Sequence, residues 1–248
     1  MNTKRAGILV ILWLAVSLAS CLATDIAFSG TSGSLAATVR FEFSGGALKV
    51  TLLNTSSADV LVPSDALTAV FFDIAGDPIL TPDWARVSHE SCVLYYDAQC
   101  HADMDVGGEW AYVRNMAPSL VAQHYGISSA GFGVFGPGDR FPGFPTLTPP
   151  DSPDGLDWAL LSAGDNPATG NTGVTNQPLI RNAAVFRFTG LPGGFNPAAA
   201  IRNVRFQYGT DLDEPHFDEI PEPATFGLIG LGLVGLGFLG RRYGRRWA

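Results

Sequence analysis

Lysine is almost absent from the chain, which has only Lys4 and Lys49. Lys and Arg together number 15 against 23 Asp and Glu, so the formal net charge is −8. Six basic residues lie in the first five or last eight positions, whereas every acidic residue lies between Asp25 and Glu222. The middle therefore carries 9 − 23 = −14. Because nucleic-acid binding needs clustered Lys and Arg, this balance excludes a nucleic-acid partner for the body.

Cysteine and histidine are also scarce, with 3 Cys and 4 His in 248 residues. Residues 89–93 lack the second histidine of a zinc protease, and residues 126–130 lack the final glycine of a nucleophile elbow. No spacing singles out a carboxylate pair of the kind that glycosidases use. We therefore predict that the protein is not an enzyme, with a secreted hydrolase as an alternative.

The first 23 residues have the parts of a secretory signal peptide. Lys4 and Arg5 form a positive start, and residues 8–19 form an apolar stretch that is too short for a bilayer, which needs about 20 residues. We predict that the general secretion machinery exports the chain and that residues 1–23 are removed. The sequence ending at Cys21 also matches a lipobox, so lipidation there stays open.

A second apolar run lies near the other end of the sequence. Residues 224–240 contain no charge and would reach about 26 Å as a helix, enough to cross the hydrocarbon core of a membrane. Four arginines follow at once: Arg241, Arg242, Arg245 and Arg246. By the positive-inside rule they stop transfer and keep this end in the cytoplasm. The sequence thus predicts one transmembrane helix and an inner-membrane-anchored precursor with its body outside.

Pro221, Glu222 and Pro223 stand just before this run. The prolines prevent regular structure, so the segment is extended and exposed, a shape suited to a protease groove. Motif, span and arginine cluster, in that order, resemble the PEP-CTERM sorting signal of Gram-negative bacteria that make exopolysaccharide. The resemblance implies that a membrane enzyme, exosortase, recognises the motif, removes the span and sends the body to the cell surface or extracellular matrix.

Residues 24–219 are left as one acidic extracytoplasmic domain, and residues 220–248 form the sorting signal. Alternating apolar and polar residues predict β-strands, the first two joined in a hairpin by the turn at residues 44–46. The strand candidates are residues 39–43, 48–52, 67–74, 111–114, 156–161, 183–189 and 201–208. No stretch of twelve residues in the body has helical periodicity. We predict an all-β fold, an antiparallel β-sandwich or jelly-roll-like domain.

Two cysteines, Cys92 and Cys100, remain once the signal peptide is removed. An even pair in an oxidising compartment predicts one local disulfide. The alternative is a metal site with the nearby His89 and His101, but zinc sites usually pair cysteines two to four positions apart.

Clustered acidic residues offer oxygen ligands of the kind that calcium prefers. They are Asp103, Asp105, Asp151, Asp154 and Asp157. The first two do not start an EF-hand loop, because Gly107 and Arg114 stand where that loop needs a third Asp or Asn and a bidentate Glu. We predict no metal and no cofactor, and keep calcium as an alternative.

Aromatic residues decide between two roles for the body. Trp84 and Trp158, if exposed, would support a carbohydrate-binding module, whereas aromatics at strand positions usually pack in the core, as we predict for Trp110. Our leading hypothesis is a structural or interaction component associated with exopolysaccharide or biofilm. The carbohydrate-binding module is the alternative.

Overall fold

The computed structural model describes residues 24–94, 99–143, 153 and 155–219. The predicted signal peptide, the Pro221–Pro223 motif, the span and the arginine cluster lie outside these residues. Within the described ranges, no helix is long and apolar enough to cross a membrane. The described body is mostly β, which confirms the predicted fold class at that level.

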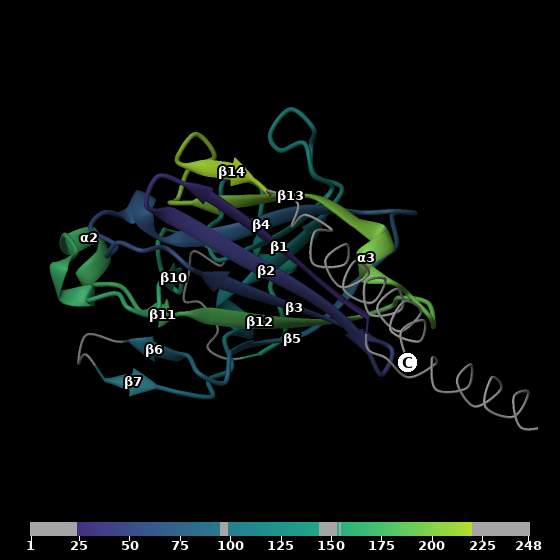
Figure 1. Ribbon diagram of the computed structural model, residues 1–248, viewed down its shortest axis with the longest axis horizontal. Coiled ribbons are helices and arrows are strands. Elements are labelled where there is room, and N and C mark those ends of the chain that lie inside the picture. Colours follow the sequence, from purple (N-terminus) through teal and green to yellow (C-terminus); the bar gives the residue numbers. More distant parts are fainter. Residues whose placement is uncertain (1–23, 95–98, 144–152, 154, 220–248) are drawn as a thin grey trace, which may run out of the picture.

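The first sheet has five strands in the order β1-β2-β3-β12-β5, all paired antiparallel. In Figure 1, β1 and β2 run diagonally across the view, and β3, β12 and β5 follow below them. Their bounds are β1 Thr24–Ser32, β2 Leu35–Ser44, β3 Ala47–Asn54, β12 Ala183–Thr189 and β5 Thr81–Val87. Because β1, β2 and β3 follow one another in sequence, half of this sheet forms through short-range contacts.

The second sheet runs in the order β14-β13-β4-β10-β11-β6-β7, with β9 also on β4 and β8 on β9. The bounds are β14 His216–Asp218, β13 Ile201–Tyr208, β4 Leu67–Ile74, β10 Leu160–Leu161, β11 Leu179–Arg181, β6 Cys92–Leu94, β7 Cys100–His101, β9 Tyr125–Ser128 and β8 Ala111–Arg114. Strands β10 and β11 pair in parallel. The predicted antiparallel sheet is therefore confirmed only in part, because this pair makes the second sheet mixed.

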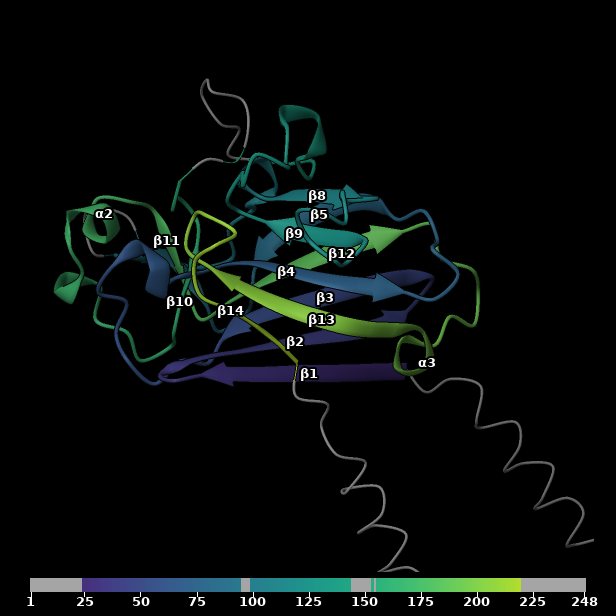
Figure 2. The same cartoon turned by 90° about the horizontal axis from the view of Figure 1, so that it is seen from above.

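The two sheets face each other across one core. Rings from opposite sheets meet in it: Phe41 of β2 and Phe72 of β4 have centroids 5.0 Å apart, and Tyr112 of β8 lies 4.9 Å from Phe188 of β12. In Figure 2, β4 and β13 lie over β2 and β3. Such aromatic pairs contribute about 0.5–1.5 kcal/mol each beyond the area they bury, so they hold the layers together.

The predicted hairpin is confirmed. Ser44 pairs with Ala47, which leaves Gly45 and Gly46 as a two-residue loop. Both glycines have positive φ, 58° and 78°, as a type I′ turn requires. The strands predicted at residues 67–74, 111–114, 183–189 and 201–208 coincide with β4, β8, β12 and β13.

The strand predicted at residues 156–161 is mostly wrong. Only Leu160 and Leu161 pair, while residues 155–158 form a turn in which Trp158 has φ 64°. The helices labelled in Figure 1 are single turns, α2 Thr172–Thr175 and α3 Pro197–Ala200. Each begins after an asparagine whose side chain accepts a backbone N–H, and this bond stabilises the first turn.

Candidate functional site

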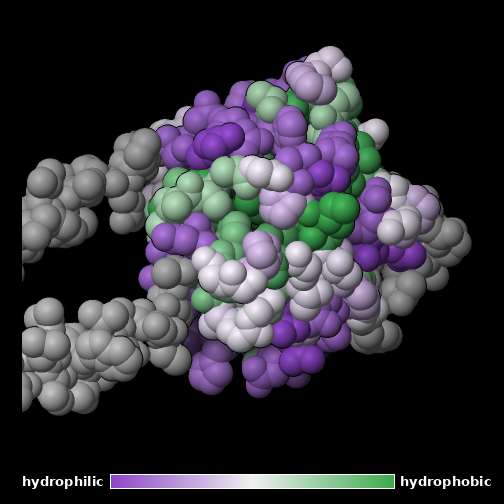
Figure 3. Space-filling model, turned by 90° about the vertical axis from the view of Figure 1, so that its right-hand side faces the viewer, coloured by the Kyte–Doolittle hydropathy of each residue, from purple (hydrophilic) through white to green (hydrophobic). Residues whose placement is uncertain are grey.

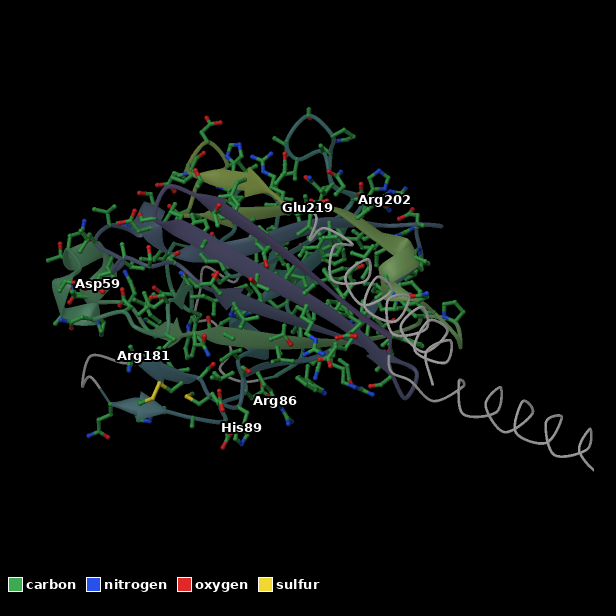
Figure 4. The ribbon with its side chains drawn as sticks, viewed as in Figure 1. Asp59, Arg86, His89, Arg181, Arg202 and Glu219 are labelled. Atoms are coloured by element: carbon green, nitrogen blue, oxygen red, sulfur yellow. A yellow bond between two sulfur atoms is a disulfide. The ribbon has the colours of Figure 1, made fainter. Side chains whose placement is uncertain are left out.

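Strand β14 and Glu219 join the body to the predicted sorting signal, and they form the candidate functional site. The pairs between β13 and β14 are Arg205↔Asp218, Phe206↔Phe217 and Gln207↔His216. One residue further, the Glu219 N–H donates to the Val204 carbonyl at 2.8 Å. Glu219, labelled in Figure 4, is also the last described residue. The last ladder bond among the described residues therefore lies two residues before Pro221.

Phe217 is the side chain that anchors β14. Its ring lies 5.6 Å from the rings of both Phe206 and Tyr208. On its other side it contacts Gly30 of β1, where an added Cβ would come within 2.6 Å of the ring. Its neighbours His216 and Asp218 are exposed. Strand β14 is thus held by one half-buried aromatic side chain and a short ladder.

The turn that precedes β14 is held by more bonds than the strand itself. The Gln207 side-chain amide donates to the carbonyls of Asp211 and Glu214 at 3.0 and 3.2 Å. The Glu214 carboxylate accepts the N–H groups of Thr210 and Asp211 at 2.5 and 2.9 Å. Gly209 has φ 74°, and a Cβ there would meet the Glu214 carboxylate at 2.1 Å. The start of β14 is therefore fixed more firmly than its end.

Both ends of the described body lie along one edge of the sandwich. Strand β1, which begins at Thr24, is an edge strand of the first sheet, and β14 is the edge strand of the second. The two strands contact each other, and Figure 2 shows them side by side with α3 near the start of β1. The segments before Thr24 and after Glu219 therefore leave the body at the same edge.

The predicted disulfide between Cys92 and Cys100 is confirmed. It joins β6 to β7, with the Cα atoms 5.2 Å apart, and is drawn in yellow in Figure 4. The sulfur atoms are bonded to each other, so the alternative of metal-bound thiolates near His89 and His101 is wrong. The loop at residues 95–98 lies outside the described residues.

The predicted calcium ligands are only partly described, because Asp151 and Asp154 fall outside the described ranges. The Asp105 carboxylate accepts the Gly107 N–H of its own loop at 3.0 Å and lies close to Gly143 of a distant loop. Asp103 is exposed, with φ 56°. Among the described residues, no three His, Cys, Asp or Glu side chains gather as a metal site.

Glu109 is a buried carboxyl that sequence reasoning missed. It closes the short 3-10 helix Gly107–Glu109, is 5% exposed, and its Oε2 has no hydrogen-bond partner among the described residues. Burial raises the pKa of Glu109 to about 7; the charge of Asp157 adds to the rise and Arg140 opposes it. The group therefore keeps its proton close to neutral pH, but it is enclosed and not open to a substrate. A lone Glu after two glycines carries no sequence signal of burial.

The aromatic residues considered above differ in their burial. Trp110 is fully buried, as predicted, and Tyr112 is buried beside it. Trp158 is 5% exposed, so the idea that it forms an exposed binding platform is wrong. Trp84 on β5 is half-buried, and the Arg86 guanidinium, labelled in Figure 4, lies 5.0 Å from its ring centre.

The described residues form an open groove with a volume of about 690 Å³. It lies between three loops and mixes apolar and acidic side chains, among them Leu120, Phe132, Leu212, Asp211 and Asp213. On the face seen in Figure 3, at the end where α3 lies, hydrophobic and hydrophilic residues are interspersed. Of the large exposed apolar residues in the described part of the chain, Leu61 and Val62 are adjacent in sequence, Ile79 stands apart, and Leu120 lines this groove.

The comparison with protein families identifies the segment that follows the body. A family model described as the PEP-CTERM protein-sorting motif matches residues 219–246. The match begins at Glu219, the residue directly after β14. The chain therefore carries the sorting motif of exported proteins whose processing partner is an exosortase. No curated protein and no solved structure matched the chain.

Proposed function

We propose that the chain is made as a membrane-anchored precursor, that an exosortase cuts it at residues 221–223, and that the β body goes to the cell surface or extracellular matrix. The observation that carries this proposal is the match of the sorting motif to residues 219–246. The match begins directly after β14, the last strand of the described body. Cleavage at Pro221 to Pro223 would therefore remove the anchor without removing any strand of the body.

We further propose that the body is a non-enzymatic structural or interaction component of an exopolysaccharide matrix or biofilm. Its charge of 9 − 22 = −13 over residues 24–219 favours solubility outside the cell. The disulfide suits an oxidising compartment. The carboxyl with the largest pKa rise, Glu109, is closed off from solvent, which is unsuitable for a general acid.

Mass spectrometry of the mature protein from its host tests the processing step. We expect a C-terminus between residues 221 and 224 in cells with exosortase and the uncut chain in cells without it. The variant Glu222→Ala should slow processing, whereas Asp213→Asn, an exposed acidic residue in the turn before β14, should not. Recovery of a mature chain that still contains Trp247 and Ala248 would contradict the proposal.

A carbohydrate-binding role has one specific observation in its favour, the half-buried Trp84 beside the exposed Arg86. An indole face next to a guanidinium offers stacking and hydrogen bonding to a sugar ring. Glycan-array binding by the body that is lost in Trp84→Ala, but kept in Arg202→Ala on the exposed part of β13, would favour this second role. Binding that survives Trp84→Ala would place the ligand elsewhere.

A further inference from the structure

We propose that β14 is a releasable strand, which leaves the edge of the second sheet so that the exosortase can bind the residues before Pro221. The inference rests on the proposed cleavage at residues 221–223. An extended peptide spans at most about 3.6 Å per residue, so Pro221 lies within about 7 Å of Glu219. A groove that binds a peptide by its backbone needs several residues on each side of the cut. Here those residues are still paired with β13.

The contacts of β14 make local release feasible. Three register pairs and the Glu219 bond are its ladder, and Phe217 is its one half-buried anchor. By contrast, seven of the eight residues of the central strand β4 are buried. Segments with few buried apolar contacts and exposed hydrogen bonds open at lower free energy than the core. Strand β14 therefore opens without unfolding of the sandwich.

The turn before β14 confines the release to a few residues. Gln207 and Glu214 bond the turn from both sides, so it stays in place when the strand leaves. Release of residues 216–219 adds about 13 Å of extended chain before Pro221. That length places the motif clear of the sheet edge and gives the enzyme free backbone groups to pair with.

Gly30 determines how closely β14 packs against β1. The lack of a side chain at this position lets Phe217 lie flat against β1, and the same ring contacts Phe206 and Tyr208. Tyr208 also donates its hydroxyl to the Ala36 carbonyl at 2.9 Å, a bond in which Phe217 takes no part. Phe217 thus packs between the edges of the two sheets, and this contact can break while the core stays packed.

A disulfide lock across β13 and β14 tests the inference on the full-length precursor. Glu219 and Val204 form a hydrogen-bonded pair, so the next pair along, Arg205 and Asp218, is of the non-hydrogen-bonded kind. The Cα atoms of such pairs are about 4.5 Å apart, within the range of a disulfide. We would follow conversion of Arg205→Cys/Asp218→Cys to the mature form by pulse-chase in cells with exosortase.

We expect the locked precursor to be processed at least about tenfold more slowly, because cleavage follows the open population of the strand. Each single cysteine variant should be processed at the wild-type rate. In isolated membranes, a reductant should restore processing of the locked precursor and leave the rate of the wild type unchanged.

The variant Phe217→Ala tests the opposite case, in which β14 is held less firmly and opens more often. We expect it to be processed several-fold faster than wild type, again because the open population rises. The matched control is Phe195→Ala, which removes another edge ring, one that packs on Phe43 at 5.5 Å. Equal rates for the locked, Phe217→Ala and wild-type precursors would overturn the inference alone. A wild-type precursor that is never cut would overturn the proposed function as well.

Discussion

Glu109 sets a pH dependence that the surface charges do not reveal. The unfolded chain releases this proton near the ordinary pKa of 4.5, whereas the folded protein releases it near pH 7. Between these values the folded state holds more protons, so stability falls as the pH rises and then stays level above pH 7. The pKa values of Asp165 and Glu219 are also raised by burial, so a variant is needed to isolate the effect of Glu109.

Glu109→Gln should remove this loss of stability with rising pH. The amide cannot ionise, so the free energy of unfolding of the variant, relative to wild type, should rise by up to about 3 kcal/mol between pH 4.5 and 7. Urea denaturation of residues 24–219 at several pH values measures the difference. A difference that does not change with pH would show that Glu109 ionises normally in the folded state.

Tyr125 and Asp77 hold the loop between β4 and β5. The fully buried Tyr125 hydroxyl lies 2.8 Å from Asp77 Oδ1 and 2.7 Å from the Pro78 carbonyl, and Arg114 donates to Asp77 Oδ2 at 2.6 Å. The Tyr125 hydrogen bond is the main cause of the lowered pKa of Asp77. Asp77 also has φ 46°, so its side-chain bonds stabilise an unfavourable backbone conformation.

Tyr125→Phe should therefore cost about 1–2 kcal/mol, because it leaves these acceptors without the hydroxyl donor. A double-mutant cycle with Asp77→Ala, measured by urea denaturation, isolates the pair. A coupling energy near zero would contradict a direct bond between the two side chains.

The role of a single residue was predictable where it depends on residues close by in sequence. Cys92 and Cys100 are an even pair with short spacing, and the disulfide follows from that alone. Glu109 and Trp158 were not, because their burial depends on segments far away in sequence: the Trp158 N–H donates to the Pro178 carbonyl at 2.6 Å. The apolar run around Trp158 indicated a strand, but the turn geometry there is fixed by this distant contact.

At the scale of elements, the β2–β3 hairpin depends on its two glycines. Gly46 has φ 78° and open space around its Cα, so Gly46→Ala adds backbone strain without a clash. We expect a loss of about 1 kcal/mol. The matched control is Gly193→Ala, also in open space but without a positive φ, and it should change stability little. Equal melting temperatures for the two variants would contradict the type I′ turn.

The disulfide should stabilise the β6–β7 segment by restricting the conformations that the unfolded chain can adopt. For a loop of this size the loop-entropy relation gives roughly 2–3 kcal/mol. Cys92→Ala/Cys100→Ala should lower the free energy of unfolding by that amount, as should reduction of the wild type. A reductant that lowers the stability of the double variant as well would point to another cause.

Strands were predictable where apolar residues alternate or form a bounded run. Strands β4, β12 and β13 have such patterns, and their predicted bounds match the structure. Strand β9 was missed because its residues 125–128 are few and include Gly126, which gives no periodic signal. The pairing itself, such as β12 beside β3, joins residues more than a hundred positions apart, which no local pattern specifies.

At the scale of the whole molecule, the two sheets share their main hydrophobic core. The main core includes residues of both sheets, and the buried Asn54 side chain at the end of β3 donates to the Leu160 carbonyl of β10 at 2.7 Å. Neither sheet can therefore bury its inner face without the other. Thr24 begins β1 and Glu219 makes the last ladder bond among the described residues, so the described strands around this core all lie within residues 24–219.

Residues 24–219, expressed in an oxidising compartment without either end, should therefore fold alone and unfold in a single transition. Calorimetry should give a van't Hoff enthalpy equal to the calorimetric enthalpy, the test of two-state behaviour. The acidic body repels itself, so moderate salt should raise the melting temperature without splitting the transition. Two separate transitions would mean that the sheets are independent domains, and aggregation on removal of residues 220–248 would mean that this segment covers part of the fold.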